Sequence, residues 1–365
     1  MIQEALLEWF DGHHRVLPWR TDRTPYGTWI SEAMLQQTRV VTVLDYYPRF
    51  LQVFPDPFAL SQANEDTVLK LWEGLGYYSR ARNLQRGAHY ICEHFDGKLP
   101  SDPKLLQTIP GIGPYMAGAI ASQAFNIPVP AVDGNCIRIY SRLHALPLVP
   151  TERSAYNEVY ARVLQDIPSD NPGDFNEALM DLGATICTPK SPRCEICPLA
   201  ASCSAMLLGK QTDFPLPKPK KIIPIEEHTI LKVFVGNRVL VNKRPNKGLL
   251  AGLFEYVDLP GQLSSEEVVS WVREHLPVQR AQDNHYDIRV LGHAHHIFTH
   301  LRWNMLGYEI HFSEDHFRDV ELDSSLGMLV SEEECAQLAF PTALSAYHAA
   351  STTSFTHRPK SKNRS

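Results

Sequence analysis

Residues 105–120 read Leu-Leu-Gln-Thr-Ile-Pro-Gly-Ile-Gly-Pro-Tyr-Met-Ala-Gly-Ala-Ile, which predicts a helix, a tight turn and a second helix. Gly111 and Gly113 allow backbone conformations closed to other residues, and Pro114 suits the first position of the next helix. The free N–H groups at such a helix start form an anion site, suited to a DNA phosphate. A packed helical corner without a ligand is the alternative interpretation.

Four cysteines lie close together further along the chain. Their spacing is Cys-X6-Cys-X2-Cys-X5-Cys, made by Cys187, Cys194, Cys197 and Cys203. In a reducing compartment such a group is typical of a metal or cluster site rather than of disulfides. Zinc sites usually pair their ligands as two short knuckles, and only Cys194 and Cys197 are so paired. The uneven spacing favours an iron–sulfur cluster, with zinc or four unligated thiols as the alternatives.

Length and charge set further bounds. The chain has 365 residues, which predicts two domains, and a formal net charge of −6, which argues against a DNA-binding protein. It contains no apolar run of about 20 residues and no signal-peptide core at its start. We therefore expect a cytoplasmic protein without a membrane partner, associated with the nucleoid if the source is bacterial.

The apolar pattern changes along the chain and predicts a multidomain protein. Residues 1–213 are expected to form an all-α domain, with the helix-hairpin-helix at about 105–125 and the cysteine loop at 187–203. Its helices are expected at residues 3–10, 29–43, 65–72, 81–95, 114–124, 136–146, 154–166 and 175–185. A proline-rich linker at 214–226 precedes an α+β domain at 227–350, and a basic tail at 351–365 is expected to be disordered. The second domain is expected to contain strands 229–235, 238–242 and 303–312 and helix 266–276.

Two carboxylates stand out as candidates for chemistry. Glu32 lies inside an otherwise apolar helical segment, where burial would raise its pKa, although a solvated helix glutamate is the plainer interpretation. Asp133 lies where a turn meets a helix start, and helix capping is its plainer role. Cleavage of an N-glycosidic bond needs both a proton donor and a negative charge near the sugar, which two carboxyl groups can supply.

The cysteine spacing resembles that of the endonuclease III superfamily of DNA glycosylases. The resemblance implies one [4Fe–4S] cluster on the four cysteines, and DNA-phosphate contacts from Lys190 and Arg193 between the first two ligands. It also implies the helix-hairpin-helix glycosylase fold, in which an aspartate at the position of Asp133 is catalytic.

Four further segments closely resemble the adenine DNA glycosylases of the MutY family. They are residues 17–20, 31–38, 72–84 and 175–183. The resemblance implies removal of adenine mispaired with 8-oxoguanine or guanine in double-stranded DNA, by base flipping. In that mechanism Glu32 protonates adenine at N7 and Asp133 stabilises the oxocarbenium ion. By the same resemblance Asn135 and Tyr115 assist Asp133, Arg20 and Glu177 line the adenine pocket, and Gln37 and Tyr77 wedge into the duplex.

The residue at position 115 distinguishes an adenine glycosylase from a related class of glycosylases that also cut the DNA strand. Endonuclease III-type enzymes that also cut the strand carry a lysine at this place, whose amine forms a Schiff base. Tyrosine cannot do so, which favours a monofunctional glycosylase and leaves open weak β-elimination by another lysine. A bifunctional oxidised-pyrimidine glycosylase/lyase and a catalytically inactive lesion-binding module remain the alternatives.

The second domain resembles the Nudix fold. At the place of the metal-binding helix, residues 273–279 read Arg-Glu-His-Leu-Pro-Val-Gln and lack the glutamate pair that hydrolysis needs. In adenine glycosylases such a domain recognises 8-oxoguanine, and by this resemblance Phe298, Thr299 and His300 are the contact candidates in the loop 293–300. The histidines of that segment offer a metal site as the alternative.

The acidic net charge then requires a local basic face. We expect the DNA side to carry Lys190, Arg193, the lysines of the linker and six arginines that flank the motifs: Arg15, Arg20, Arg23, Arg80, Arg82 and Arg86. A monomer with modest, salt-sensitive non-specific affinity follows, and the sequence names no protein partner.

Overall fold

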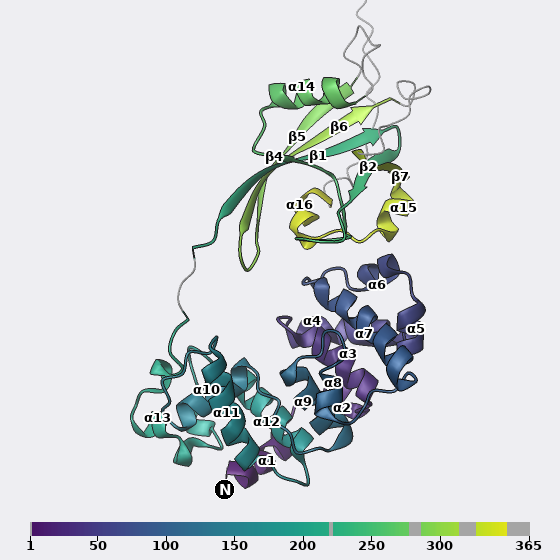
Figure 1. Ribbon diagram of the computed structural model, residues 1–365. Coiled ribbons are helices and arrows are strands. Elements are labelled where there is room, and N and C mark those ends of the chain that lie inside the picture. Colours follow the sequence, from purple (N-terminus) through teal and green to yellow (C-terminus); the bar gives the residue numbers. More distant parts are fainter. Residues whose placement is uncertain (1, 219–221, 277–285, 314–325, 349–365) are drawn as a thin grey trace, which may run out of the picture. The chain divides into compact units, whose positions relative to one another are not determined.

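The structure is a computed structural model that describes residues 2–218, 222–276, 286–313 and 326–348. The chain divides into two compact units, residues 1–220 and 221–365 (Figure 1). The first is helical and the second contains a mixed β-sheet with helices, which confirms the predicted fold class. No helix in these described ranges is long and apolar enough to cross a bilayer. The predicted tail 351–365 and linker residues 219–221 lie outside the described residues.

The first unit consists of helices joined by short turns. Their bounds are α1 (Ile2–His13), α2 (Pro18–Thr21), α3 (Pro25–Leu35), α4 (Val40–Val53), α5 (Pro57–Gln62), α6 (Glu65–Leu71), α7 (Ser79–Phe95), α8 (Pro103–Leu106), α9 (Pro114–Phe125), α10 (Gly134–Leu143), α11 (Arg153–Asp166), α12 (Pro172–Thr185) and α13 (Ser204–Leu207). Several helices begin with proline. Side chains also cap helix starts: Thr24 caps α3 and Asp133 caps α10.

One predicted helix is wrong. The segment 29–43 divides into α3 and α4, with a turn at 36–39 in which Gln37 has φ 59°. The apolar periodicity continues across the turn, so the sequence pattern does not reveal the break. The break brings Gln37 out of the helix and leaves its side chain exposed.

The hairpin positions α9 against the segment that leads to Asp133. Gly111 has φ 88°, as predicted, but Gly113 has φ −91° and ψ 178°, an extended conformation that any residue adopts. Gly118 is required for a different reason: a Cβ there would lie 2.2 Å from the carbonyl oxygen of Pro130. Because Gly118 has no Cβ, α9 can contact the backbone of the segment that precedes α10. The helices α10 and α12 then pack with α1 around a core that includes Leu6, Tyr140 and Phe175.

The second unit is a sheet in the order β3-β2-β1-β6-β5, with β4 paired to β1 and β7 to β2. Its elements are β1 (Ile225–Val235), β2 (Arg238–Lys243), β3 (Phe254–Glu255), β4 (Val257–Pro260), α14 (Ser265–His275), β5 (Tyr286–Ile297), β6 (Arg302–Phe312), β7 (Met328–Ser331), α15 (Glu332–Gln337) and α16 (Ser345–His348). Strands β1 and β2 form the predicted hairpin at Gly236-Asn237. Helix α14 packs on one face of the sheet, and α15 and α16 pack on the other (Figure 1).

Strand β5 was not predicted. Its residues alternate in burial, but many of them are polar, so the strand does not stand out in the sequence. Residues 293–297, expected in a loop, form the end of this strand, and only 298–301 make the turn to β6. Of the segment that replaces the Nudix metal helix, residues 277–279 lie outside the described residues.

Candidate active site and cluster loop

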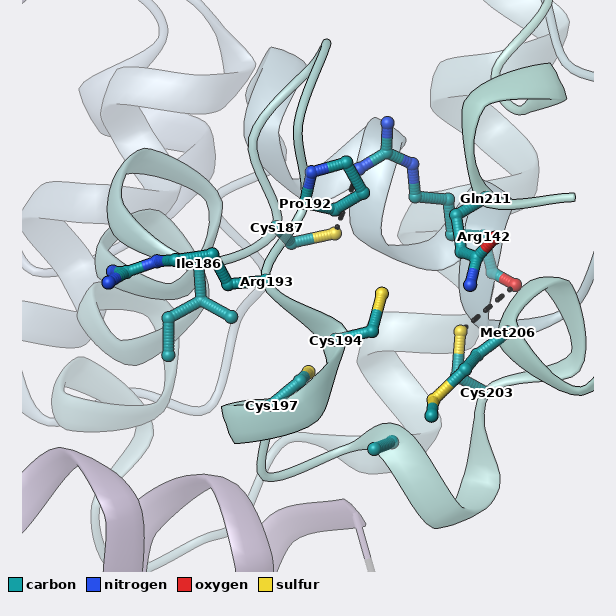
Figure 2. A pocket seen from close by; sticks show the side chains of 11 residues that line it. Arg142, Ile186, Cys187, Pro192, Arg193, Cys194, Cys197, Cys203, Met206 and Gln211 are labelled. Carbon is teal, nitrogen blue, oxygen red and sulfur yellow. Dashed lines mark hydrogen bonds between the residues drawn. The ribbon is translucent and has the colours of Figure 1, made fainter. Parts of the chain in front are cut away.

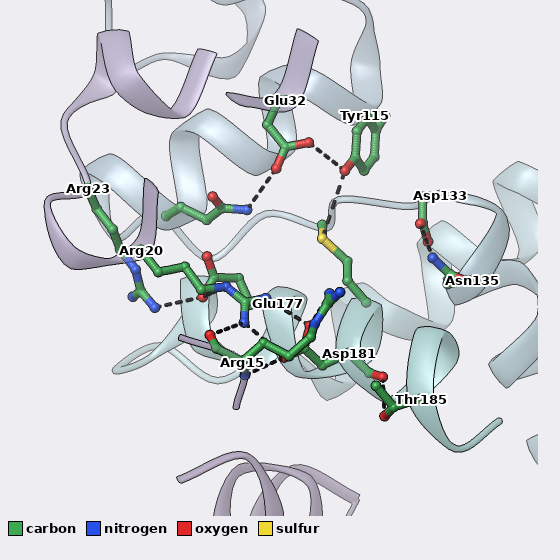
Figure 3. A network of polar contacts seen from close by, with 12 residues as sticks. Arg15, Arg20, Arg23, Glu32, Tyr115, Asp133, Asn135, Glu177, Asp181 and Thr185 are labelled. Carbon is green, nitrogen blue, oxygen red and sulfur yellow. Dashed lines mark hydrogen bonds and ion pairs between the residues drawn. The ribbon is translucent and has the colours of Figure 1, made fainter. Parts of the chain in front are cut away.

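Glu32 is buried between α3 and α9. Its side chain lies on α3 and the residue is 4% exposed, so the solvated alternative does not apply. The Tyr115 hydroxyl donates to Glu32 Oε2 at 2.6 Å, and Gln123 Nε2 donates to Oε1 at 3.4 Å (Figure 3). Burial raises the pKa of Glu32 to about 7, although both hydrogen bonds oppose the shift. A carboxyl group with this pKa can act as an acid near neutral pH.

Asp133 occupies a different environment. As the N-cap of α10, its Oδ1 accepts the Cys136 N–H at 2.8 Å, and its Oδ2 accepts the Asn135 amide at 2.7 Å (Figure 3). Burial raises the pKa of Asp133, but these donors and the nearby Arg138 guanidinium favour its anion. Capping and anionic character therefore coexist in one side chain. Burial raises the pKa of Tyr115, and the negative charges of Glu32 and Asp133 raise it further, so its hydroxyl interacts with both carboxyl groups.

A chain of hydrogen bonds joins Asp133 to the cysteine loop. Asn135 Oδ1 accepts from Arg138 Nη2 at 2.8 Å, and Arg138 Nε donates to the carbonyl of Cys187 at 2.8 Å. One turn later on α10, Arg142 Nη1 lies 3.3 Å from Cys187 Sγ. Neither arginine was singled out from the sequence. The sequence does show that they lie four residues apart on the helix that Asp133 caps, which places them on the same side of that helix.

The predicted pocket residues Arg20 and Glu177 belong to a larger network of ions. Asp174, Glu177 and Asp181 lie on one face of α12, because spacings of three and four residues bring side chains to the same side. The arginines alternate with them: Arg20 pairs with Glu177 at 3.2 Å and with Asp181 at 2.8 Å (Figure 3).

The outer arginines complete the network. Arg23 pairs with Glu177 and Asp174, both at 2.7 Å, and Arg15 Nε donates to Asp181 at 2.8 Å. Burial raises the pKa of Glu177, whereas the bonds from Arg20 and Arg15 overcome burial and lower the pKa of Asp181. Asp181 was not among the predicted site residues, although it lies four residues after Glu177 in the segment 175–183.

The two predicted wedge residues share an unusual backbone. Gln37 and Tyr77 both have positive φ, 59° and 47°, and both side chains are exposed. Such conformations are costly for these residue types and are concentrated at functional sites. Arg80 holds the two turns together: its guanidinium donates to the carbonyls of Ala33 and Met34 on one side and of Leu75 and Gly76 on the other.

The expected basic face is therefore smaller than predicted. Arg80 is 7% exposed and its guanidinium donates to four backbone carbonyls, so it does not contribute to an exposed basic face. Arg15, Arg20 and Arg23 bind carboxylates of α12, and Arg82 pairs with Glu65 at 3.0 Å. Arg86 is exposed, as are Lys190 and Arg193, although Arg193 Nη2 also donates to the Thr185 carbonyl at 2.7 Å.

The predicted anion site at the hairpin lies at the start of α9, where Gly113 has a conventional backbone. This residue is the N-cap of α9, and no atom lies within 4 Å of the position where its Cβ would be. The missing side chain leaves the N–H groups of α9 open to approach. Gly111 contributes the left-handed turn itself.

The four loop cysteines line one pocket. Cys187, Cys194, Cys197 and Cys203 surround it with Arg142, Met206 and Gln211 (Figure 2). Within residues 2–218 and the other described ranges, no three Cys, His, Asp or Glu side chains converge as a single metal ion requires. Four thiols that line one pocket are a donor set that suits an iron–sulfur cluster. Arg142 is buried with carbonyl and thiol partners, and its charge suits an anionic group in this pocket.

The three candidates in the second unit lie at the β5–β6 turn. Thr299 and His300 are exposed, whereas Phe298 is half-buried with its ring 5.2 Å from that of Trp303. The Phe298 N–H donates to the Leu301 carbonyl at 2.9 Å and closes the turn. Among the described residues the histidines of this segment form no group able to bind a metal ion.

Comparison with protein families agrees with this geometry. Residues 30–163 match the HhH-GPD superfamily of base excision DNA repair proteins, residues 187–203 the iron–sulfur binding domain of endonuclease III, and residues 229–350 the NUDIX domain. The adenine DNA glycosylase of Arabidopsis thaliana is 36% identical and that of Rattus norvegicus 35%. The matches cover 82% and 85% of this chain, but 55% of the plant protein and 70% of the rat protein.

A bacterial relative matches over most of both chains. The adenine DNA glycosylase of Buchnera aphidicola subsp. Baizongia pistaciae is 35% identical, over 82% of this chain and 83% of its own length. This chain belongs to the adenine DNA glycosylase family. It is accordingly a hydrolase of N-glycosyl bonds in base excision repair.

Solved structures agree on the helical fold of this glycosylase. A thermostable thymine-DNA glycosylase superimposes with a TM-score of 0.53 at 25% identity, over 56% of this chain and 94% of that one. A trapped endonuclease III–DNA complex gives a TM-score of 0.50 at 22% identity, over 57% and 94%.

The pKa of Glu32 predicts the pH dependence of the glycosylase. A proton donor with a pKa of about 7 is active below that pH, so kcat/KM should fall about tenfold per pH unit above it. Because the Tyr115 hydroxyl lowers this pKa, Tyr115→Phe should shift the descending limb upward while lowering the maximum rate. The measurement is kcat/KM from about pH 5 to about pH 9. A profile without a descending limb would contradict the assignment.

Proposed function

We propose that this enzyme hydrolyses the N-glycosidic bond of adenine mispaired with 8-oxoguanine or guanine in double-stranded DNA, without cutting the strand. One observation carries the proposal: a buried carboxyl group, Glu32, and a half-buried one, Asp133, lie in environments that separate their roles. Each accepts two hydrogen bonds, but Glu32, with a pKa of about 7, has only the neutral side chains of Tyr115 and Gln123 as its donors, whereas Asp133 also lies near the guanidinium of Arg138. Such a pair suits acid catalysis with stabilisation of an oxocarbenium-like transition state.

In the proposed mechanism, adenine is flipped out of the duplex and Glu32 transfers its proton to N7. The base then departs as a neutral leaving group while positive charge develops on the sugar. The ionised Glu32 next accepts a proton from a water molecule as the oxygen of that water bonds to C1′ of the sugar cation. Tyr115 supports this cycle because its hydroxyl hydrogen-bonds to Glu32 at 2.6 Å and stabilises the carboxylate form.

Asp133 stabilises the sugar cation. The Cys136 N–H and the Asn135 amide keep its oxygens fixed, so little reorganisation is needed as charge appears. The same position allows attack of the carboxylate on the cation to form an acetal, which is a further part of the proposal. Tyr115 has no amine, which supports hydrolysis without strand cleavage.

We assign DNA contacts to several parts of the protein. Gly111, Gly113, Lys190 and Arg193 are proposed to bind phosphates, Gln37 and Tyr77 to fill the space of the flipped adenine, and Arg20 and Glu177 to line its pocket. In the second unit, Phe298, Thr299 and His300 are proposed to recognise 8-oxoguanine. The exposed hydroxyl and imidazole at the β5–β6 turn supply the hydrogen-bonding groups, and Phe298 supplies a stacking surface.

One [4Fe–4S] cluster is proposed on Cys187, Cys194, Cys197 and Cys203. When bound, it supplies cross-links between four points of the loop and negative charge beside Arg142. The loop in turn provides the carbonyl of Cys187 that holds Arg138, and thereby the polar chain that leads to Asp133. The cluster in this assignment is structural.

The proposal predicts that Asp133→Asn abolishes adenine release. Asparagine also caps helices, so α10 should form as before, while the loss of negative charge should slow excision by roughly 10³-fold. Single-turnover assays on duplexes with adenine opposite 8-oxoguanine provide the measurement. Asp102→Asn is the matched control, because Asp102 caps the short helix α8 in the same way. No free adenine from the unmodified enzyme would refute the proposed function.

The cluster assignment predicts a brown protein that absorbs at about 400 nm. Cys194→Ser should remove both the colour and the iron, because one thiolate ligand is lost. Cys92→Ser should retain them, because Cys92 lies outside the loop. Optical spectra with metal analysis provide the measurement, and a colourless protein that contains zinc would contradict the assignment.

The proposed role of Thr299 predicts a loss of discrimination. Thr299→Ala removes one hydroxyl from an exposed turn, so the ratio of excision rates opposite 8-oxoguanine and guanine should fall about 2–10-fold. Thr299→Ser keeps the hydroxyl and should retain the ratio. Rates opposite both bases provide the measurement, and equal ratios for all three proteins would exclude the contact.

A further inference from the structure

Gln123 is a polar residue in a helix that offers no other amide or charged side chain. Helix α9 has the sequence Pro-Tyr-Met-Ala-Gly-Ala-Ile-Ala-Ser-Gln-Ala-Phe, and its residues 116–122 are all buried. Gln123 lies two turns after Tyr115, on the same side of the helix, and is half-buried. Both side chains reach across to Glu32 on α3, which packs against α9.

The two oxygens of Glu32 are divided between these neighbours. Tyr115 donates to Oε2 and Gln123 Nε2 donates to Oε1, and Glu32 has no other hydrogen-bond partner in the described part of the chain. The bond to Glu32 also determines how the amide is oriented. When Glu32 is ionised, a reversed amide would place its oxygen against a carboxylate oxygen, and two acceptors would repel each other. The Gln123 oxygen therefore points away from Glu32 as a free acceptor beside the acid.

This pair of groups matches one edge of adenine. Adenine presents N7, an acceptor, next to its N6 amino group, a donor, whereas guanine presents two acceptors there, N7 and O6. A proton donor beside an acceptor complements adenine and repels guanine. Glutamine is known to read adenine N6 and N7 with its own amide; here Glu32 would take the place of the donor.

We propose that Gln123 is a specificity-determining residue, which accepts a hydrogen bond from the adenine N6 amino group while its amide nitrogen holds Glu32 at N7. The inference rests on the proposed function, since it names the base whose N7 Glu32 protonates.

The test is a cycle of two proteins and two bases. Single-turnover excision opposite 8-oxoguanine is measured for adenine and for purine, which lacks the amino group, with the unmodified enzyme and with Gln123→Met. The methionine has a similar size without hydrogen-bonding groups. We expect excision of adenine to slow about 3–10-fold more than excision of purine, because only adenine loses a contact. The comparison cancels the intrinsic difference between the two leaving groups.

A second variant separates the two halves of the amide. Gln123→Glu keeps an acceptor oxygen but replaces the donor to Glu32 with a carboxyl group, so it should retain the preference for adenine over purine. It should also move the descending limb of the pH–rate profile upward, since a nearby negative charge disfavours ionisation of Glu32. Unfolding temperatures verify that both variants fold.

The outcomes are distinguishable. If the unmodified enzyme releases no adenine, the proposed function fails. If it releases adenine but Gln123→Met slows adenine and purine equally, the proposed function stands and the Gln123 inference is overturned. A Gln123→Glu enzyme that loses the preference for adenine would likewise overturn it.

Discussion

The carboxyl group of Glu32 is buried in the contact between α3 and α9, and this burial raises its pKa to about 7. In water the group would be ionised at neutral pH and unable to donate a proton. The apolar residues of α3 thus both pack the core and raise the pKa of Glu32, since they exclude water from its carboxyl group. The two donors on α9 limit the shift, because each stabilises the ionised form that must exist after the proton has left. Catalysis needs both forms, and a pKa near the working pH keeps both accessible.

The environment of Asp133 depends on a second constraint, the satisfaction of two arginines on α10. Arg138 donates to the Cys187 carbonyl of the cysteine loop and to the Gly183 carbonyl of α12, and Arg142 donates to a carbonyl and a thiol of the loop. No carboxylate forms an ion pair with either arginine within the described residues. A buried guanidinium that lost these acceptors would be strongly destabilised. The conformation of the loop is therefore coupled to α10, and α10 begins at Asp133. The conformation of the cysteine loop can therefore affect the position of Asp133 through this path.

Much of the fold was predictable from the sequence because local signals determine it. Apolar periodicity located most helices of the first unit, and Gly236-Asn237 located the β1–β2 hairpin. The break at Gln37 was not predictable, since a left-handed residue leaves no trace in an amphipathic pattern. Motifs supplied the candidate site residues, and the structure brings Glu32 and Tyr115 together and, separately, Asp133 and Asn135. Asp181, Arg138 and Gln123 required the structure, because their significance lies in the partner that each one meets across the fold.

The distribution of charge explains how an acidic protein can handle DNA. Three arginines near the N-terminus pair with three carboxylates of α12, so they add little to the field outside the protein. A lining of matched charges suits a pocket for a neutral base, which offers hydrogen bonds but no charge. The N–H groups at the start of α9, which no side chain caps, and a few exposed cations such as Lys190 and Arg86 remain available to anions. If these groups bind the phosphates as proposed, counterion release contributes less to DNA binding than in a strongly basic protein, because the groups are few.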